Sequence, residues 1–376
     1  MKKSKKIAII LAISATFGGV LSSPPERTYA ADIVIDSQDK FNDLKINSDW
    51  SYTVNDCLYL KAPVYDNTII FEDITSDISL AGGRGSAADN NNNTIILLNS
   101  KVNANDVIGG YASEGKDANN NKVIFVNSEI NAHVFGGDSH KGNACGNTVI
   151  IDKTNIIGER EIYGGFAYVP PKSGDSYEYG IVSGHASNNT IIIRNGSKLE
   201  GSKIYGGYLT LTGNENTSGL TEDDFKKENN TLILDDWSGS VKAVRSCDNV
   251  NFYNVNLSDF VTKADVEPTN AILTITGDTN DYIKSDFSNI IGTDKTPIED
   301  INRDITKDIN IGLSFQGGQD INVNDTVRLI QMDQDTQAII DEKKGEKIHL
   351  ANNGTAYAGV AQVVKGELIF DEAGGE

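Results

Sequence analysis

A short apolar run recurs along the chain, each time between polar, turn-forming residues. The runs read TIIFE, TIILL, KVIFV, TVIID, TIIIR and TLILD, and each follows an Asn, at positions 67, 93, 121, 147, 189 and 230. β-Branched residues dominate, so each run predicts a short strand. Because side chains alternate between the two faces of a strand, we expect Ile69 and Phe71 and their equivalents to point inward. The polar residues that close the runs, such as Glu72, Asp152 and Arg194, should face solvent.

A second apolar stretch leads into a pair of glycines. The stretches read DISLAGG, DVIGG, HVFGG, EIYGG and KIYGG. We expect a short strand followed by a glycine pair that either supplies turn conformations with φ > 0 or lets neighbouring repeats approach closely. The glycines assigned to these predicted turns are Gly82, Gly83, Gly109, Gly110, Gly136, Gly137, Gly164, Gly165, Gly206 and Gly207.

The two landmarks share one period. Successive glycine pairs lie 27, 27, 28 and 42 residues apart, and successive Asn landmarks lie 26, 28, 26, 42 and 41 residues apart. One unit of about 27 residues cannot bury a core alone, but stacked units can. The period therefore predicts an all-β fold, a right-handed parallel β-solenoid (β-helix) of about six coils. The doubled Asn residues should occupy left-handed positions and stack as hydrogen-bonded ladders.

The two long intervals contain insertions, at residues 169–187 and 209–228. Both are polar and rich in turn residues, and they occupy the same place in consecutive repeats. A solenoid projects such insertions from one face, which is often the binding face. The candidate binding residues are those inside the insertions and the aromatic residues that lead into them: Phe166, Tyr177, Tyr179, His185, Tyr208, Asp223, Asp224 and Phe225.

Aromatic residues flank the glycine pairs. They are Phe135, Tyr163 and Tyr205 before the pairs and Tyr111, Phe166 and Tyr208 after them. Two interpretations stay open at this stage. The rings could form a platform that stacks on sugar rings, or a ladder that seals the end of the core.

The sequence outside the repeats predicts a signal peptide, an N-terminal cap and a C-terminal β-rich region. Residues 1–30 place lysines ahead of a short apolar run and end in TYA, the pattern of a signal peptide. Residues 31–65 are expected to cap the solenoid, which covers residues 66–249. Residues 250–376 lose the period and predict an irregular β-rich C-terminal cap or meander. Apart from the signal peptide, no apolar run approaches the ~20 residues of a membrane-spanning helix.

Charge and cysteine content exclude several classes of function. The chain has a formal net charge of −20, which becomes about −24 without the signal peptide, so nucleic acid is not an expected partner. Cys57, Cys145 and Cys247 form no zinc motif and allow at most one internal disulfide. The four histidines are scattered, and GGRGSA lacks the Asp of a calcium-binding repeat. We therefore expect neither a metal nor a cofactor.

Acidic pairs do not predict an active site. Asp235 and Asp236 are adjacent in sequence, so on a strand they would point to opposite faces, and the pair Asp223 and Asp224 falls in an insertion. We expect a non-catalytic protein. The alternative is a secreted parallel β-helix polysaccharide lyase or glycoside hydrolase, which would need paired carboxylates or a base beside an acidic site.

The NNT strands and YGG turns, over roughly residues 66–249, resemble the secreted passenger regions of bacterial type V autotransporters. The stretch NVNDTVRLIQ and the following meander are similar to the junction before the translocator of such proteins. The family ends in an outer-membrane barrel, which is missing up to Glu376. Either the protein continues past this residue, or the passenger is released or held by other means.

The resemblance implies an exported protein at the cell surface, in the outer membrane or outside the cell. Its function would be that of an adhesin-like or structural scaffold. The expected partners are glycans or proteins on host or neighbouring cells, bound through many weak contacts along a rigid rod.

Overall fold

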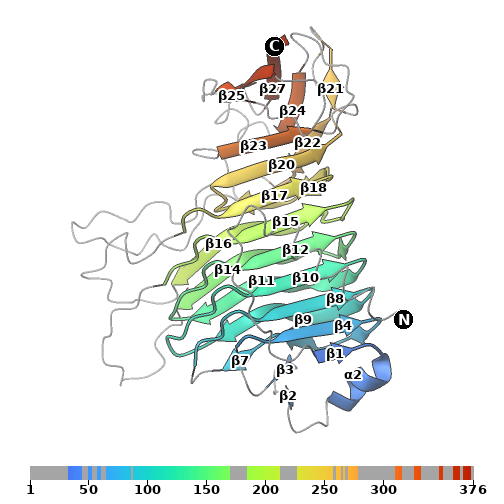
Figure 1. The fold of residues 1–376 in the computed structure, drawn as a ribbon, viewed down its shortest axis with the longest axis vertical. Coiled ribbons are helices and arrows are strands. Elements are labelled where there is room, and N and C mark those ends of the chain that lie inside the picture. Colours follow the sequence, from blue (N-terminus) through green and yellow to red (C-terminus); the bar gives the residue numbers. More distant parts are fainter. Residues whose placement is uncertain are drawn as a thin grey trace, which may run out of the picture.

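The computed structural model describes residues 33–44, 50–52, 57–60, 65–85, 88–169, 184–211, 227–256, 260–263, 266, 270–277, 310–315, 326–331, 347–349, 359–364 and 367–373. Over these residues the protein is mostly β, and most of its strands run parallel to their neighbours. Figure 1 shows the strands stacked in chain order along the long axis of the molecule.

The predicted apolar runs form the first sheet. Its strands, all parallel, are β1 (Ile33–Ile35), β4 (Thr68–Glu72), β8 (Thr94–Leu98), β10 (Lys122–Val126), β12 (Thr148–Asp152), β15 (Thr190–Arg194), β17 (Thr231–Asp235), β20 (Asn249–Val255) and β23 (Asn310–Phe315). From β4 to β17 the register never shifts, so Ile69, Ile95 and Val123 and their equivalents lie side by side.

The stretches around the glycines form the second sheet. Its strands are β2 (Trp50–Tyr52), β3 (Cys57–Leu60), β5 (Thr75–Ser76), β6 (Ser79–Ala81), β7 (Arg84–Gly85), β9 (Lys101–Ala112), β11 (Glu129–His140), β13 (Asn155–Ile156), β14 (Glu161–Val169), β16 (Lys203–Leu211) and β19 (Ala243–Arg245). All pair in parallel except β2 with β3. The chain therefore alternates between two sheets whose strands lie next to their equivalents in the following repeat.

The described C-terminal strands form a mixed third sheet. They are β18 (Gly239–Val241), β21 (Val261–Thr262), β22 (Ala271–Ile275), β24 (Thr326–Gln331), β25 (Lys347–His349), β26 (Gly359–Val364) and β27 (Glu367–Ala373). The N-terminal end carries helix α2 (Gln38–Leu44), which buries Phe41 edge-on against the Phe71 ring at 5.8 Å. The helix therefore covers the N-terminal end of the main core.

The main core contains the side chains that were predicted to point inward. Ile69 and Phe71 pack in one cluster with Val107, Val134 and Ile162 of the second sheet. A separate apolar cluster lies on the other side of the first sheet, where the middle residues of five runs are 1–4% exposed and Leu98 is 7% exposed. It contains Ile70, Ile96, Leu98, Ile124, Ile150 and Ile192.

Two polar residues that close the runs are buried, so the prediction that they face solvent is wrong. Asp152 and Arg194 are 5% and 7% exposed. They are direct neighbours across β12 and β15, and Arg194 Nη2 lies 2.7 Å from Asp152 Oδ2. Pairing of the opposite charges makes their joint burial tolerable.

The glycine pairs do not make turns, so of the two roles predicted for them the turn is wrong and the close approach of neighbouring repeats is the one observed. Gly109, Gly110, Gly136, Gly137, Gly164, Gly165, Gly206 and Gly207 lie inside strands, and Gly82 and Gly83 lie between β6 and β7. None of these glycines has a positive φ. Instead, a Cβ on Gly109 would lie 2.2 Å from the Gly136 carbonyl oxygen, and one on Gly110 would lie 2.6 Å from Asn121 Oδ1. The pairs thus serve the close approach of neighbouring repeats.

The Asn ladder is present as predicted. Each buried landmark Asn donates its side-chain amide to the next one, at 3.0–3.3 Å, from Asn67 through Asn93, Asn121, Asn147 and Asn189 to Asn230. The preceding Asn92, Asn120, Asn188 and Asn229 have φ between 57° and 60°. The second glycine of the last four pairs packs against this ladder, so the two landmarks of the sequence are in contact.

Candidate binding face

Two rows of aromatic rings lie on the outer side of the second sheet. In the first row, Phe135 stacks on Tyr163 at 4.9 Å and 12°, and Tyr163 stacks on Tyr205 at 4.8 Å and 14°. In the second row, Phe166 stacks on Tyr208 at 5.3 Å and 10°. The row spacing follows from the parallel register, because neighbouring strands are about 4.8 Å apart.

The second row packs edge-on over the first. The Phe166 ring lies 5.0 Å from Tyr163 at 73°, and the Tyr208 ring lies 5.1 Å from Tyr205 at 75°. Tyr163 and Tyr205 are consequently 5% and 4% exposed, whereas Phe166 and Tyr208 remain partly exposed. Of the sequence-predicted binding residues, Phe166 and Tyr208 are thus brought together as the accessible rings.

The rings do not line the main core. Ile162 and Ile204 belong to the core cluster, and the next residue along each strand, Tyr163 or Tyr205, points to the opposite side of the sheet. The interpretation of the rings as a seal for the core is therefore not supported. The phenol of Tyr163 is satisfied locally, since it donates to Glu161 Oε2 at 2.8 Å.

Arg84 lies at one end of this face. Its guanidinium is 4.7 Å from the centre of the Tyr111 ring and 5.5 Å from that of Tyr59. Such cation–π contacts hold the charge against the face. Burial raises the pKa of the Cys57 thiol, and the nearby Arg84 partly offsets that shift.

A buried carboxyl interrupts the aromatic row. Asp138 lies between Tyr111 and Phe166 in the register of β9, β11 and β14. Its Oδ1 is buried and has no hydrogen-bond partner. Burial, with a contribution from Asp106, raises the pKa of Asp138 to about 8, and Arg84 opposes the shift.

His140 connects this carboxyl with Tyr111. The Tyr111 hydroxyl lies 3.3 Å from His140 Nδ1, and His140 Nε2 lies 3.8 Å from Asp138 Oδ1. Burial, Arg84 and Lys141 lower the pKa of His140, so the imidazole is neutral at neutral pH. We call the outward side chains of these strands the aromatic face: Tyr111, Phe135, Asp138, His140, Tyr163, Phe166, Tyr205 and Tyr208.

Sequence reasoning missed Asp138 and His140, although a signal was present. The residue directly after each glycine pair is Arg84, Tyr111, Asp138, Phe166 or Tyr208, and the register places these five in one row. Comparison of the residues that follow the glycine pairs shows Asp138 at a position that holds an aromatic residue in three repeats and Arg84 in one.

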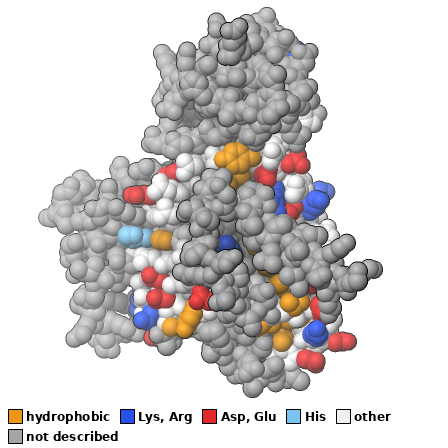
Figure 2. Space-filling view, viewed as in Figure 1, with side chains coloured by type: hydrophobic (Ala, Val, Ile, Leu, Met, Phe, Trp, Pro, Cys, Tyr) orange, Lys and Arg blue, Asp and Glu red, His pale blue; other side chains and the backbone are white. Residues whose placement is uncertain are grey.

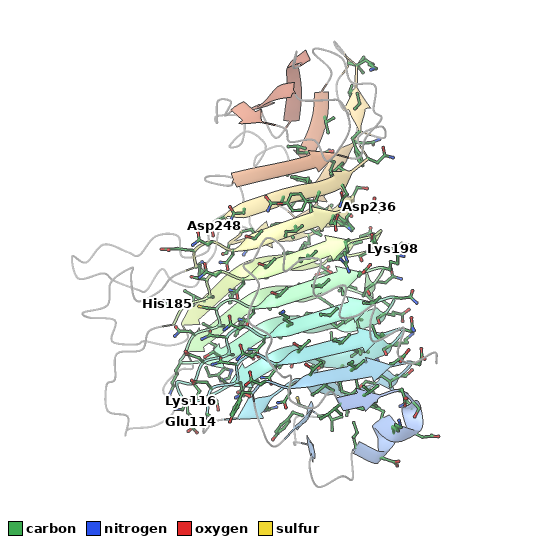
Figure 3. All side chains as sticks on the ribbon, viewed as in Figure 1. Glu114, Lys116, His185, Lys198, Asp236 and Asp248 are labelled. Atoms are coloured by element: carbon green, nitrogen blue, oxygen red, sulfur yellow. The ribbon has the colours of Figure 1, made fainter. Side chains whose placement is uncertain are left out.

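Of the other predicted binding residues the structure describes only His185, which makes no ring contact with the aromatic face. The backbone N–H of His185 donates to Asn143 Oδ1 at 3.0 Å, and its carbonyl accepts from Ala144 N at 2.8 Å. Figure 3 shows His185 at the same edge of the molecule as Glu114 and Lys116. Tyr177, Tyr179, Asp223, Asp224 and Phe225 lie outside the described residues.

The adjacent acidic residues Asp235 and Asp236 have structural surroundings and do not form an active site. Asn254 Nδ2 donates to Asp235 Oδ1 at 2.5 Å, and Asp236 is an exposed residue with a φ of 48°. Figure 3 places Asp236 at the edge opposite His185. The pair therefore does not converge on one site.

Cysteines and metal-ligating residues add no second site to the described part of the chain. Cys57, Cys145 and Cys247 are free thiols. Among the residues that the structure describes, no three His, Cys, Asp or Glu side chains are grouped to hold a metal ion. On the side of the molecule seen in Figure 2, described hydrophobic side chains form small separate patches among acidic and basic ones.

Comparison with known protein families, with characterised proteins and with solved structures gives no match. In the described ranges, no helix has the length and apolarity needed to cross a membrane.

Proposed function

We propose that the protein is an exported, non-catalytic right-handed β-solenoid of the autotransporter passenger type that binds carbohydrate on its aromatic face. Adhesion to glycans on host or neighbouring cells would follow from this role. The signal peptide pattern supports export, and the acidic charge argues against nucleic acid as a partner.

The alternation of strands supports the solenoid. The chain runs from β8 to β9, then β10, β11 and β12, and each strand pairs in parallel with its equivalent one repeat away. Parallel strands joined through a second sheet require a crossover, and crossovers are almost always right-handed. A right-handed winding of one repeat per turn accounts for both sheets at once.

The stacked pair Phe166 and Tyr208 carries the functional proposal. Two nearly parallel, partly exposed rings present a flat apolar surface, and the apolar face of a sugar ring can stack on such a surface. Ligand sites typically combine such rings with a few polar groups, which Arg84, Asp138 and His140 supply here. In the sequence, each of the two insertions begins within a few residues after one of these rings.

The test is loss of glycan binding in the double variant Phe166→Ala/Tyr208→Ala. We expect its affinity for neutral hexasaccharides of glucose and N-acetylglucosamine to fall by about tenfold or more, because two stacking surfaces are removed. Isothermal titration calorimetry measures the change. Tyr253→Ala removes a partly exposed ring from β20 of the other sheet and should leave binding intact.

Unchanged binding in the double variant would contradict the proposal, as would a wild-type protein that binds none of these sugars. Circular dichroism of each variant separates loss of binding from loss of fold.

A second candidate is the secreted polysaccharide lyase or glycoside hydrolase. The chain of contacts from Tyr111 through the neutral His140 to Asp138 favours it, because a positioned imidazole beside a hydroxyl can act as a general base. Release of new reducing ends from polysaccharides, lost in His140→Ala, would establish this function instead.

A further inference from the structure

Asp138 places a carboxyl at a position of the row where the neighbouring strands carry an aromatic ring. Tyr111 precedes it and Phe166 follows it in the parallel register, and Phe166 in turn stacks on Tyr208. The carboxyl is therefore adjacent to the rings on which a sugar would stack.

The inner oxygen of this carboxyl is unused. Asp138 is 7% exposed, and Oδ1 has no hydrogen-bond partner. A buried polar atom without a partner destabilises the folded state, and such atoms in folded proteins call for an explanation. A hydrogen-bond donor supplied by a ligand would remove this cost.

His140 faces the same oxygen at a distance that a single atom can bridge. Nε2 and Oδ1 are 3.8 Å apart, which is too far for a direct hydrogen bond. Because Oδ1 is fully buried, an oxygen atom reaches a position about 2.8 Å from both atoms only when the partly exposed His140 ring turns outward. The His140 side chain, 30% exposed, forms the outer wall of this position.

The orientation of the imidazole is set by its neighbours. The Tyr111 and Tyr168 rings pack edge-on against it at 5.0 and 4.9 Å. In the tautomer in which the Tyr111 hydroxyl donates to Nδ1, Nε2 carries the proton and is a donor. The gap then offers one donor and one acceptor, which matches a hydroxyl group because a hydroxyl both donates and accepts. An ammonium group has no acceptor and fits less well.

We infer that Asp138 and His140 anchor one sugar hydroxyl, which accepts from Nε2 and donates to Oδ1 while the sugar ring stacks on Phe166 and Tyr208. This inference rests on the proposed carbohydrate-binding function. It adds the polar contact that orients the ligand along the row.

The test uses two variants of one residue on the full chain. Asp138→Leu keeps the branched shape of the side chain but is larger and has no acceptor, whereas Asp138→Asn keeps both the size and an acceptor oxygen. We expect Asp138→Leu to bind the same neutral hexasaccharides about tenfold more weakly, and Asp138→Asn to bind within a few-fold of wild type. Thermal unfolding and circular dichroism of both variants separate loss of this contact from loss of the fold.

The outcomes separate the inference from the proposed function. Loss of binding in Phe166→Ala/Tyr208→Ala with wild-type binding in Asp138→Leu overturns the anchor alone. Equal losses in Asp138→Leu and Asp138→Asn also overturn it, because the acceptor oxygen would then not matter. Wild-type binding in the aromatic double variant, or no binding by the wild-type chain, overturns both.

Discussion

At the scale of single residues, Asp138 illustrates a conflict between burial and charge. The backbone register fixes Asp138 between Tyr111 and Phe166. The carboxyl is therefore desolvated by its neighbours on both sides. The groups that face it are Arg84 from β7, Asp106 and Tyr111 from β9, and His140 from its own strand; β14 contributes the uncharged Phe166. Together these contacts favour the neutral acid.

The protein should therefore become more stable when Asp138 can no longer ionise. The pKa of the carboxyl is about 8 in the folded chain and about 3.9 when unfolded. Its contribution to folding is thus fully present below about pH 4 and is lost as the pH rises towards 8. Asp138→Asn should exceed wild type in unfolding free energy by on the order of a few kcal/mol at pH 8, with the difference shrinking towards pH 5.

Urea unfolding at pH 5, 6.5 and 8 measures this difference. Asp236→Asn replaces an exposed carboxylate whose φ of 48° suits Asn, so it serves as the comparison variant. A difference between Asp138→Asn and wild type that is the same at all three pH values would contradict a raised pKa.

At the scale of elements, the strands of the first sheet could be predicted because period and alternation agree in every copy. The predicted run at residues 68–72 is β4, and the other five runs match their strands equally well. For the glycine pairs the sequence left two roles open, turns or close approach of neighbouring repeats, because Gly suits both. Their actual role depends on how near the next repeat lies, and a single repeat read alone does not contain that distance.

The aromatic face was only half predictable for a similar reason. Phe166 and Tyr208 stood out because they precede the insertions. The contact of Tyr111 with His140 joins residues 29 positions apart, and the burial of Asp138 arises only when repeats are stacked. Likewise, Ser100, Ser128, Thr154 and Ser197 form a second ladder, in which each hydroxyl accepts from the backbone N–H of the preceding repeat.

Substitution of a glycine inside a strand should therefore be costly. A Cβ at Gly136 would lie 2.3 Å from the Gly164 carbonyl oxygen and 3.0 Å from Asn147 Cβ, so the sheet must separate locally. We expect Gly136→Ala to lower the unfolding free energy by about 1–3 kcal/mol.

Chemical denaturation provides the measurement. Gly196 has a φ of 71° and would place a Cβ with no atom within 4 Å, so Gly196→Asn is the matched control, because Asn tolerates this conformation. Equal stability of Gly136→Ala and wild type would rule out the close approach as the role of the pair.

At the scale of the whole molecule, each repeat contacts mainly its neighbours. The register between β8 and β10 is the same as that between β10 and β12, and the Asn ladder continues through all of them. In such quasi-one-dimensional folds stability is approximately a sum over units and their interfaces.

Removal of one complete unit should accordingly leave a folded protein. Deletion of residues 121–146 brings Asn147 into the place of Asn121, and the 26-residue step between them matches a repeat. We expect the shortened chain to keep its β circular dichroism spectrum and to lose about 4.8 Å of length by small-angle X-ray scattering. It should also lose the pH-dependent stability attributed to Asp138.

A deletion of 20 residues that starts inside β11, residues 134–153, is the control. It removes the second half of β11 and all of β12, so no strand of the first sheet separates β11 from β14, and the shortened chain should fail to fold cooperatively. Equal behaviour of the two deletions would contradict the modular description.

The uninterrupted Asn ladder also bears on how such a gene can change. Unequal recombination between two copies of the unit removes or adds a segment that starts and ends at equivalent Asn codons, and the product retains every side-chain hydrogen bond of the ladder. The number of repeats can therefore change without compensating substitutions among the buried residues.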